Sequence, residues 1–143
     1  MEEVSLSAAV VETIADLPYA VAYFATALLV YVLGLAAYIA AAPIPEFRLI
    51  GQGNTAAACS LAGAMVGLAL PLATVVATSG SMLDLLVWAI AALLVQLLTL
   101  AILRRLLPVL NRNVVAGQLA SGIFLAALAV AVGFINAGAF LLF

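Results

Sequence analysis

Histidine is absent from this chain of 143 residues, cysteine occurs once, and lysine and arginine together occur only four times. The single cysteine, Cys59, has no partner for an intrachain disulfide. Neither a nucleophile with a neighbouring base nor a cluster of metal ligands can be assembled from the residues present. We therefore expect a protein that is not an enzyme and that uses no cofactor or metal ion, and we expect no nucleic-acid partner.

Charged residues make up only 7% of the chain and hydrophobic residues 69%, with a mean hydropathy of +1.41. Soluble domains are roughly 45–50% apolar and about 25% charged. Four long apolar stretches fill most of the chain, and each reaches the roughly 17–25 residues that cross a hydrocarbon core. The sequence predicts an all-α polytopic membrane protein with transmembrane helices at 19–42, 54–78, 83–107 and 113–143. The last stretch is longer than a membrane requires, so we expect it to tilt, break near residues 133–138, or project from the membrane.

The first 17 residues carry apolar side chains at helical spacing: Leu6, Val10, Ile14 and Leu17. Glu12 and Asp16 share another face, which is typical of a helix that lies along the membrane interface. A frayed acidic tail is the alternative. Pro18 suits the first turn of the first span. We therefore divide the chain into an interfacial segment, 1–17, and a membrane domain, 18–143.

All four basic residues lie in or beside two of the gaps between the apolar stretches: Arg48, Arg104, Arg105 and Arg112. Arginine near the ends of a span favours the cytoplasmic side of the membrane. The sequence thus predicts a multi-pass membrane protein, with both arginine-bearing connections cytoplasmic and both termini on the outer side. The same side chains are expected to attract acidic lipid headgroups.

The second half of the chain resembles the first when it is displaced by about 59 residues. Three pairs carry the resemblance: Asn54 with Asn113, Ala57 with Ala116, and Gly63 with Gly122. Because each half crosses the membrane twice, the halves would be parallel two-helix repeats, at about 18–79 and 80–143. Chance similarity between alanine-rich segments is the alternative.

Uncharged polar residues are few within or at the start of the stretches, and five are candidates for a polar cavity: Asn54, Thr55, Gln96, Asn113 and Gln118. The two asparagines could cap helices, or their helix starts could face an anion, an ion pathway or a lipid headgroup. Gln96 lies near the middle of the third stretch, where an unpaired amide is costly. It must therefore face another helix or a hydrated conduit.

Small residues recur along the second and fourth stretches: Cys59, Gly63, Gly67, Gly117, Ser121 and Gly122. In lipid, small side chains let helix backbones approach closely. We expect these residues to pack helices within or between subunits. No acidic residue is found deep within a stretch, so we do not expect the buried ionisable groups on which proton relays and coupled transporters depend.

Residues 48–58 (RLIGQGNTAAA), followed by Gly63, Gly67 and Pro71, resemble the first signature of the YjfL-like bacterial inner-membrane proteins, domain-of-unknown-function family three-fifty. Residues 113–117 (NVVAG) and Gly122 resemble the second signature, and Gln96 fits the same pattern. The resemblance implies a four-helix protein of the bacterial inner membrane, so the outer side that holds both termini is expected to be the periplasm. It brings no established substrate, cofactor or catalytic residue. The two signatures differ after their asparagines, because Val114 and Val115 follow Asn113 whereas Thr55 and Ala56 follow Asn54.

Two classes of function follow from these features. The first is a homo-oligomeric structural or regulatory membrane subunit, whose partners are lipids, further copies of itself, or another membrane or cytoplasmic protein. The alternative is an oligomeric channel or pore for a small ion or solute. A lone four-helix bundle fills its centre with side chains, so both hypotheses favour an oligomer.

Overall fold

The computed structural model describes the backbone of residues 2–142 and the side chains of residues 8–141. Over this range the chain consists of helices joined by short turns and contains no strand, which confirms the all-α prediction. The elements are α1 (Glu2–Ala41), α2 (Glu46–Gly51), α3 (Thr55–Thr78), α4 (Met82–Leu106), α5 (Pro108–Val115), α6 (Leu119–Ala139) and the 3-10 helix η1 (Phe140–Leu142). The side chain predicted at Leu6 and the ends of the chain, Met1 and Phe143, lie outside the described residues.

Among the described residues, four helices are long and apolar enough to cross a membrane: residues Ala8–Ala41 of α1, and α3, α4 and α6. The prediction of four transmembrane helices is confirmed, and the second and third spans agree with it to within one residue. The fourth span was placed wrongly. It begins at Leu119, because residues 108–115 form the separate helix α5, and it passes through Gly133 without a break.

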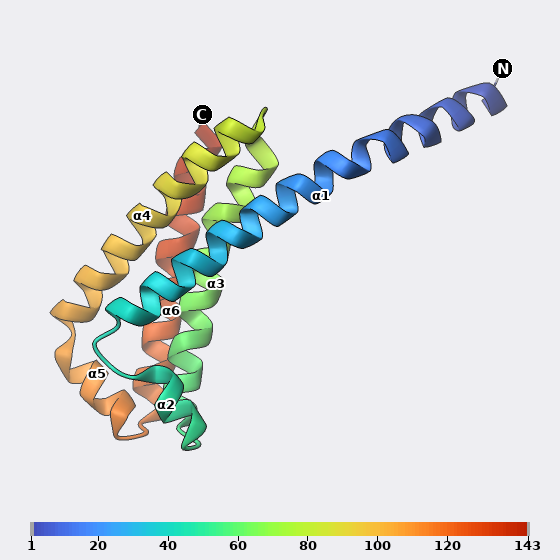
Figure 1. The fold of residues 1–143 in the computed structure, drawn as a ribbon. Coiled ribbons are helices and arrows are strands. Elements are labelled where there is room, and N and C mark those ends of the chain that lie inside the picture. The colour runs from blue at the N-terminus through green and yellow to red at the C-terminus, as the bar shows by residue number, and fades with distance from the viewer. Residues whose placement is uncertain (1, 143) are drawn as a thin grey trace.

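Helix α1 continues through Pro18 without interruption. The expectation that Pro18 begins a new helix is therefore wrong, and no break divides residues 2–17 from the span. At about 1.5 Å per residue, 40 residues make a helix roughly 60 Å long. Figure 1 shows α1 crossing the bundle diagonally, with its N-terminal half extending away from the other helices. Residues 8–22, which we call the α1 arm, are all exposed.

Helices α3 and α6 run parallel through the centre of the bundle (Figure 1) and touch backbone to backbone. A Cβ atom added at any of four glycines would collide with the opposite helix: Gly63 with Ala126, Gly67 with Ala129, Gly122 with Ala56, and Gly133 with Gly67. These contacts define the α3–α6 seam. In lipid, such close approach supplies the dispersion contacts that hold helices together. The small residues of α3 and α6 thus pack within a single chain.

Two of the predicted packing residues lie differently from the seam glycines. Gly117 is outside the helices, at φ 80° in the turn before α6, and an added Cβ would meet nothing within 4 Å. Only glycine adopts such a φ readily, so this residue serves the turn and not helix packing. Cys59 is partly exposed on α3, whereas Ser121 is buried near the start of α6.

The turns before α3 and α6 revise the predicted alignment of the two halves. Gly53 and Gly117 both have positive φ, and each stands two residues before the first residue of a long helix. Asn54 therefore matches Gln118 in position, and not Asn113 as the displacement of about 59 residues required. The duplication itself stays a prediction.

Candidate functional site

A buried polar site lies at the end of the bundle where the four arginines are found, which we call the arginine-bearing end. Nη2 of Arg104 donates to Oε1 of Glu46 at 2.8 Å, to Oγ of Ser60 at 2.8 Å, and to the hydroxyl of Tyr38. Nη1 of Arg104 donates to Oδ1 of Asn111 at 3.4 Å. The side chains of Arg104 and Glu46 are only 7% and 1% exposed. Together these residues form a buried ion-pair network.

Each member of the network comes from a different helix: Tyr38 from α1, Glu46 from α2, Ser60 from α3, Arg104 from α4 and Asn111 from α5. Ser60 Oγ also donates to Glu46 Oε1 at 3.1 Å, and Asn111 Nδ2 donates to the carbonyl of Arg104 at 2.7 Å. The network therefore ties five helices together at one end of the bundle.

The local sequence explains how the two charges are placed. Pro43 and Pro45 follow the end of α1, and the chain turns so that Glu46 begins α2 with its N–H bonded to the carbonyl of Ile44 at 2.9 Å. Arg104 lies in the last turn of α4, where the helix dipole favours a positive charge. The helix dipole of α4 thus favours the positive charge of Arg104, and the prolines direct the chain so that Glu46 can meet it.

Because Arg104 and Glu46 are both buried away from water, each charge needs the other to compensate it. Removing one partner of a buried pair typically costs about 3–5 kcal/mol, because the other charge is left uncompensated. The guanidinium carbon of Arg104 also lies 5.7 Å from the ring centroid of Tyr38, a cation–π distance. Among the described residues, Oε2 of Glu46 is buried and accepts no hydrogen bond. Glu46 and Arg104 therefore depend strongly on one another.

This network corrects two expectations. The sequence does supply buried ionisable groups, since Glu46 and Arg104 are enclosed. Arg104 is also unavailable to lipid headgroups, unlike Arg48, Arg105 and Arg112, which are exposed. The sequence does contain one signal for this site. Glu46 lies in the same connection as Arg48, whereas the other acidic residues lie outside the arginine-bearing connections.

A second polar contact lies near the middle of the bundle. Gln96 is fully buried, and its Nε2 donates to the carbonyl of Ala129 at 3.3 Å. Asn136 Nδ2 donates to Oε1 of Gln96 at 3.2 Å and to the carbonyl of Ala92 at 2.9 Å. Gln96 therefore faces protein, through a partner on α6 that the sequence reasoning did not identify.

Residues 12–140 match the model of the family described as Domain of Unknown Function (DUF350). The chain belongs to this family. Two relatives, the UPF0719 inner membrane protein YjfL of Escherichia coli (strain K12) and that of Escherichia coli O157:H7, are each 32% identical over 116 residues, which cover 81% of this chain and 88% of the relative. No solved structure matches the chain. The relatives are inner membrane proteins by description, in agreement with the four apolar helices of this family member.

The remaining candidates of the predicted polar cavity lie toward the arginine-bearing end. Asn54 caps α3, because its Oδ1 accepts from the N–H of Ala57 at 2.9 Å, and its Nδ2 donates to the carbonyl of Val114 at 2.8 Å. The capping prediction is confirmed for Asn54. It is wrong for Asn113, which lies inside α5 and whose carbonyl accepts from the N–H of Gln118 at 2.9 Å.

Thr55 and Gln118 are exposed beside the helix starts, and the Gln118 side chain makes no capping bond to α6. Gln96 lies near the middle of α4, enclosed by α3 and α6. Within the described part of one chain, the five candidates therefore do not meet in a single cavity. The structure instead separates an ion-pair network at the arginine-bearing end from an amide pair in the middle of the bundle.

Proposed function

We propose that this protein is a homo-oligomeric structural subunit of the bacterial inner membrane, in which the α1 arm of one copy packs against another copy. The carrying observation is that residues 8–22 are all exposed, whereas α3 and α6 are in close backbone contact at the α3–α6 seam. A subunit of this kind acts through association and not through catalysis.

The composition of the α1 arm supports a protein neighbour. Apolar side chains alone give no preference for protein over lipid, because the bilayer core is equally apolar. The arm also carries Ala8, Ala15 and Ala22, spaced by seven residues and therefore near one face of the helix. Small residues on one face allow close helix contact, as the glycines of the α3–α6 seam do within the chain.

The closed interior favours a structural subunit over a channel. The seam glycines leave no room for a Cβ, and Gln96 and Asn136 bond to each other and to backbone carbonyls. Polar groups that satisfy one another do not need water. Purified protein in liposomes is expected to give no ion or solute flux above that of empty liposomes, and a protein-dependent flux would favour the channel.

The proposed orientation places the arginine-bearing end in the cytoplasm and both termini in the periplasm. The support is that Arg48 in α2, Arg105 in the last turn of α4 and Arg112 in α5 are all exposed. Helices α2 and α5 and the end of α4 lie at one end of the bundle (Figure 1), as the positive-inside rule requires of cytoplasmic connections. Reporter fusions at the C-terminus and after Val109 should be active in the periplasm and the cytoplasm, respectively. A cytoplasmic C-terminus would contradict this orientation.

Photo-cross-linking tests the proposed association. A benzophenone amino acid in place of Tyr19, which is 70% exposed on the α1 arm, should give a covalent two-chain species on illumination of intact membranes. The matched control carries the same group in place of Phe134, which is 62% exposed on α6. We expect much less product from the control. Equal yields from both positions, or no two-chain species from position 19, would contradict the proposal.

A further inference from the structure

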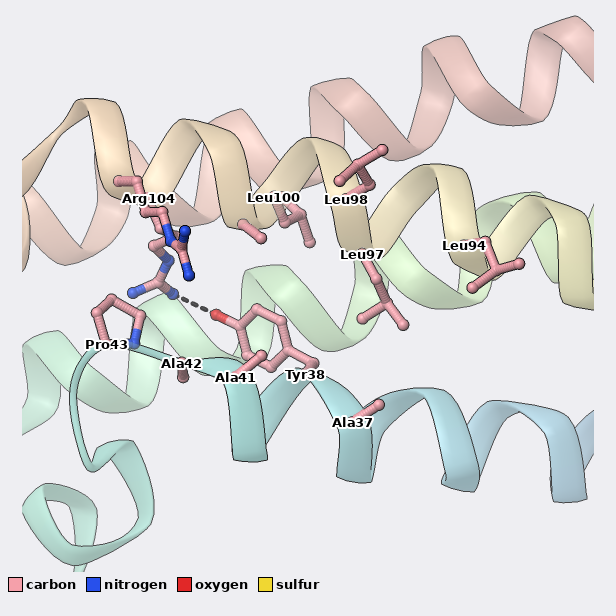
Figure 2. A pocket seen from close by; sticks show the side chains of 12 residues that line it. Ala37, Tyr38, Ala41, Ala42, Pro43, Leu94, Leu97, Leu98, Leu100 and Arg104 are labelled. Atoms are coloured by element: carbon pink, nitrogen blue, oxygen red, sulfur yellow. Dashed lines mark hydrogen bonds between the residues drawn. The ribbon is translucent and has the colours of Figure 1, made fainter.

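A pocket of about 340 Å³ lies between the end of α1 and the second half of α4. Figure 2 shows its two sides, with the small residues Ala37 and Ala41 on α1 and the leucines Leu94 and Leu97 on α4, with Tyr38 between the two helices and Arg104 at one end. The volume is within the range of about 300–1,000 Å³ that is usual for small-molecule sites. We call this pocket the α1–α4 slot.

The α1–α4 slot opens toward the surface of the bundle. Ala37 and Ala41 are exposed on one side of it, and Leu94 and Leu98 on the other, at 62% and 64% for the two leucines. All four lie in transmembrane helices, so the slot opens where the bilayer surrounds the protein. An empty apolar gap forfeits dispersion contacts along its walls. Hydrocarbon from the bilayer is therefore the natural material to occupy it.

The dimensions of the slot match one leaflet. Its lining on α4 runs from Leu94, near the middle of the helix, to Arg105, one residue before its end. This stretch of helix is about 16 Å long at ~1.5 Å per residue. Half of a hydrocarbon core of about 30 Å is about 15 Å. One acyl chain of the leaflet on the arginine-bearing side would thus lie along the slot from the interface to the bilayer middle.

The charge at the end of the slot selects the headgroup. Arg104 is neutralised by Glu46, so it closes the polar end of the slot without offering a free charge. Arg105 also lines the slot, is exposed, and forms no ion pair within the described residues. An arginine without an acidic partner can bind phosphate oxygens through charge-assisted hydrogen bonds.

From these observations we propose that the α1–α4 slot is a specific binding site for an anionic phospholipid, with one acyl chain between α1 and α4 and the phosphate at Arg105. Anionic lipid is chosen over zwitterionic lipid because the local charge at the slot entrance is positive. This inference is independent of the association of the α1 arm, which lies at the other end of α1.

Native mass spectrometry of the full chain tests the site. Protein in detergent is given equal amounts of dioleoylphosphatidylglycerol and dioleoylphosphatidylcholine, and retained lipid is counted per chain. We expect one tightly retained phosphatidylglycerol. Arg105→Gln should weaken its retention about fivefold, the contribution of one arginine near a membrane surface. Arg112→Gln, which removes another exposed arginine that lies outside the slot, should change retention less than twofold.

Two further measurements separate the acyl chain from the phosphate. Ala41→Leu fills the slot and should reduce retention of both lipids, whereas Ala36→Leu, on the exposed surface of α1 outside the slot, should not. Glycerol phosphate, which has the charge but no chain, should not displace the bound lipid.

Equal retention of the two lipids by the unsubstituted protein would overturn the proposal. Equal losses in Arg105→Gln and Arg112→Gln would also overturn it, because they would indicate general surface attraction. Displacement by glycerol phosphate would show a simple phosphate site. A change in the number of subunits on Ala41→Leu would show that a second copy of the chain occupies the slot. Because Arg105 is exposed, its substitution keeps the test decisive even where a filled slot prevents folding.

Discussion

Helix α1 and the α3–α6 pair are similarly apolar, yet they are held in the bundle in different ways. The α3–α6 seam closes along its length through glycines that bring the two backbones into contact. Helix α1 packs only in its second half, where Gly34 lies against Leu93, Tyr31 donates to the carbonyl of Met65 at 3.2 Å, and Tyr38 joins the ion-pair network. The α1 arm has no such contact. In lipid, small residues and polar groups decide which helix surfaces associate, because apolarity alone does not.

The largest effect is expected from breaking the ion pair that fixes the end of α1. Glu46→Ala leaves Arg104 buried without its carboxylate, and it should lower the free energy of unfolding by about 3–5 kcal/mol, as measured by denaturing-detergent titration. Glu12→Ala, which removes an exposed carboxylate of the α1 arm, is the control and should leave stability unchanged.

The double variant Glu46→Gln with Arg104→Met sharpens this prediction. Because it removes both charges, its loss of unfolding free energy should be smaller than the sum of the losses measured for Glu46→Gln alone and for Arg104→Met alone. Additive losses would mean that the two residues contribute separately, and the ion pair would then not be what fixes α1.

A bulky residue in the α3–α6 seam is expected to have the next largest effect. Gly63→Leu places a side chain where Ala126 backbone atoms lie, so the two helices must separate, at a cost of about 1–3 kcal/mol or more. The melting temperature in detergent should fall. Gly138→Leu, at a glycine of α6 with open space around it, is the matched control. If both variants melt alike, close backbone contact does not hold the seam.

A smaller effect is expected from the amide pair in the middle of the bundle. Gln96→Leu removes the bonds to Asn136 and to the carbonyl of Ala129, but Asn136 still donates to the carbonyl of Ala92. Measured polar contacts between membrane helices average about 0.6 kcal/mol and reach about 1.7 kcal/mol. The loss of unfolding free energy should lie in this range. Thr99→Val is the control, because the hydroxyl of Thr99 donates to the carbonyl of Val95 within α4. A loss of unfolding free energy no greater than that of the control would show that the bonds of Gln96 do not stabilise the bundle.

The sequence was sufficient for features that depend on local chemistry. Hydropathy located α3 and α4 to within a residue, and the capping preference of asparagine correctly identified Asn54. The glycine spacing in α3 indicated close packing, although it could not name Ala126 as the neighbour. Such features follow from the solvent and from neighbours only a few positions away.

The features that sequence reasoning missed depend on partners distant in the chain. Glu46 and Arg104 are brought together by helix packing across 58 positions, and Gln96 meets Asn136 across 40. Neither pairing leaves a local pattern. Asn113 failed as a cap because Pro108 starts the separate helix α5, which moves the start of the last span to Leu119.

Counting subunits in membranes tests most directly whether the α1 arm packs against another copy of the chain. Fluorescently labelled protein is extracted from bacterial membranes in polymer-bounded nanodiscs, and photobleaching steps are counted for each disc. We predict two or more copies for the unsubstituted chain, and mostly single copies when Ala15→Leu and Ala22→Leu remove the small face of the arm. Single copies of the unsubstituted chain, or an unchanged count in the double variant, would contradict the proposed role of the arm.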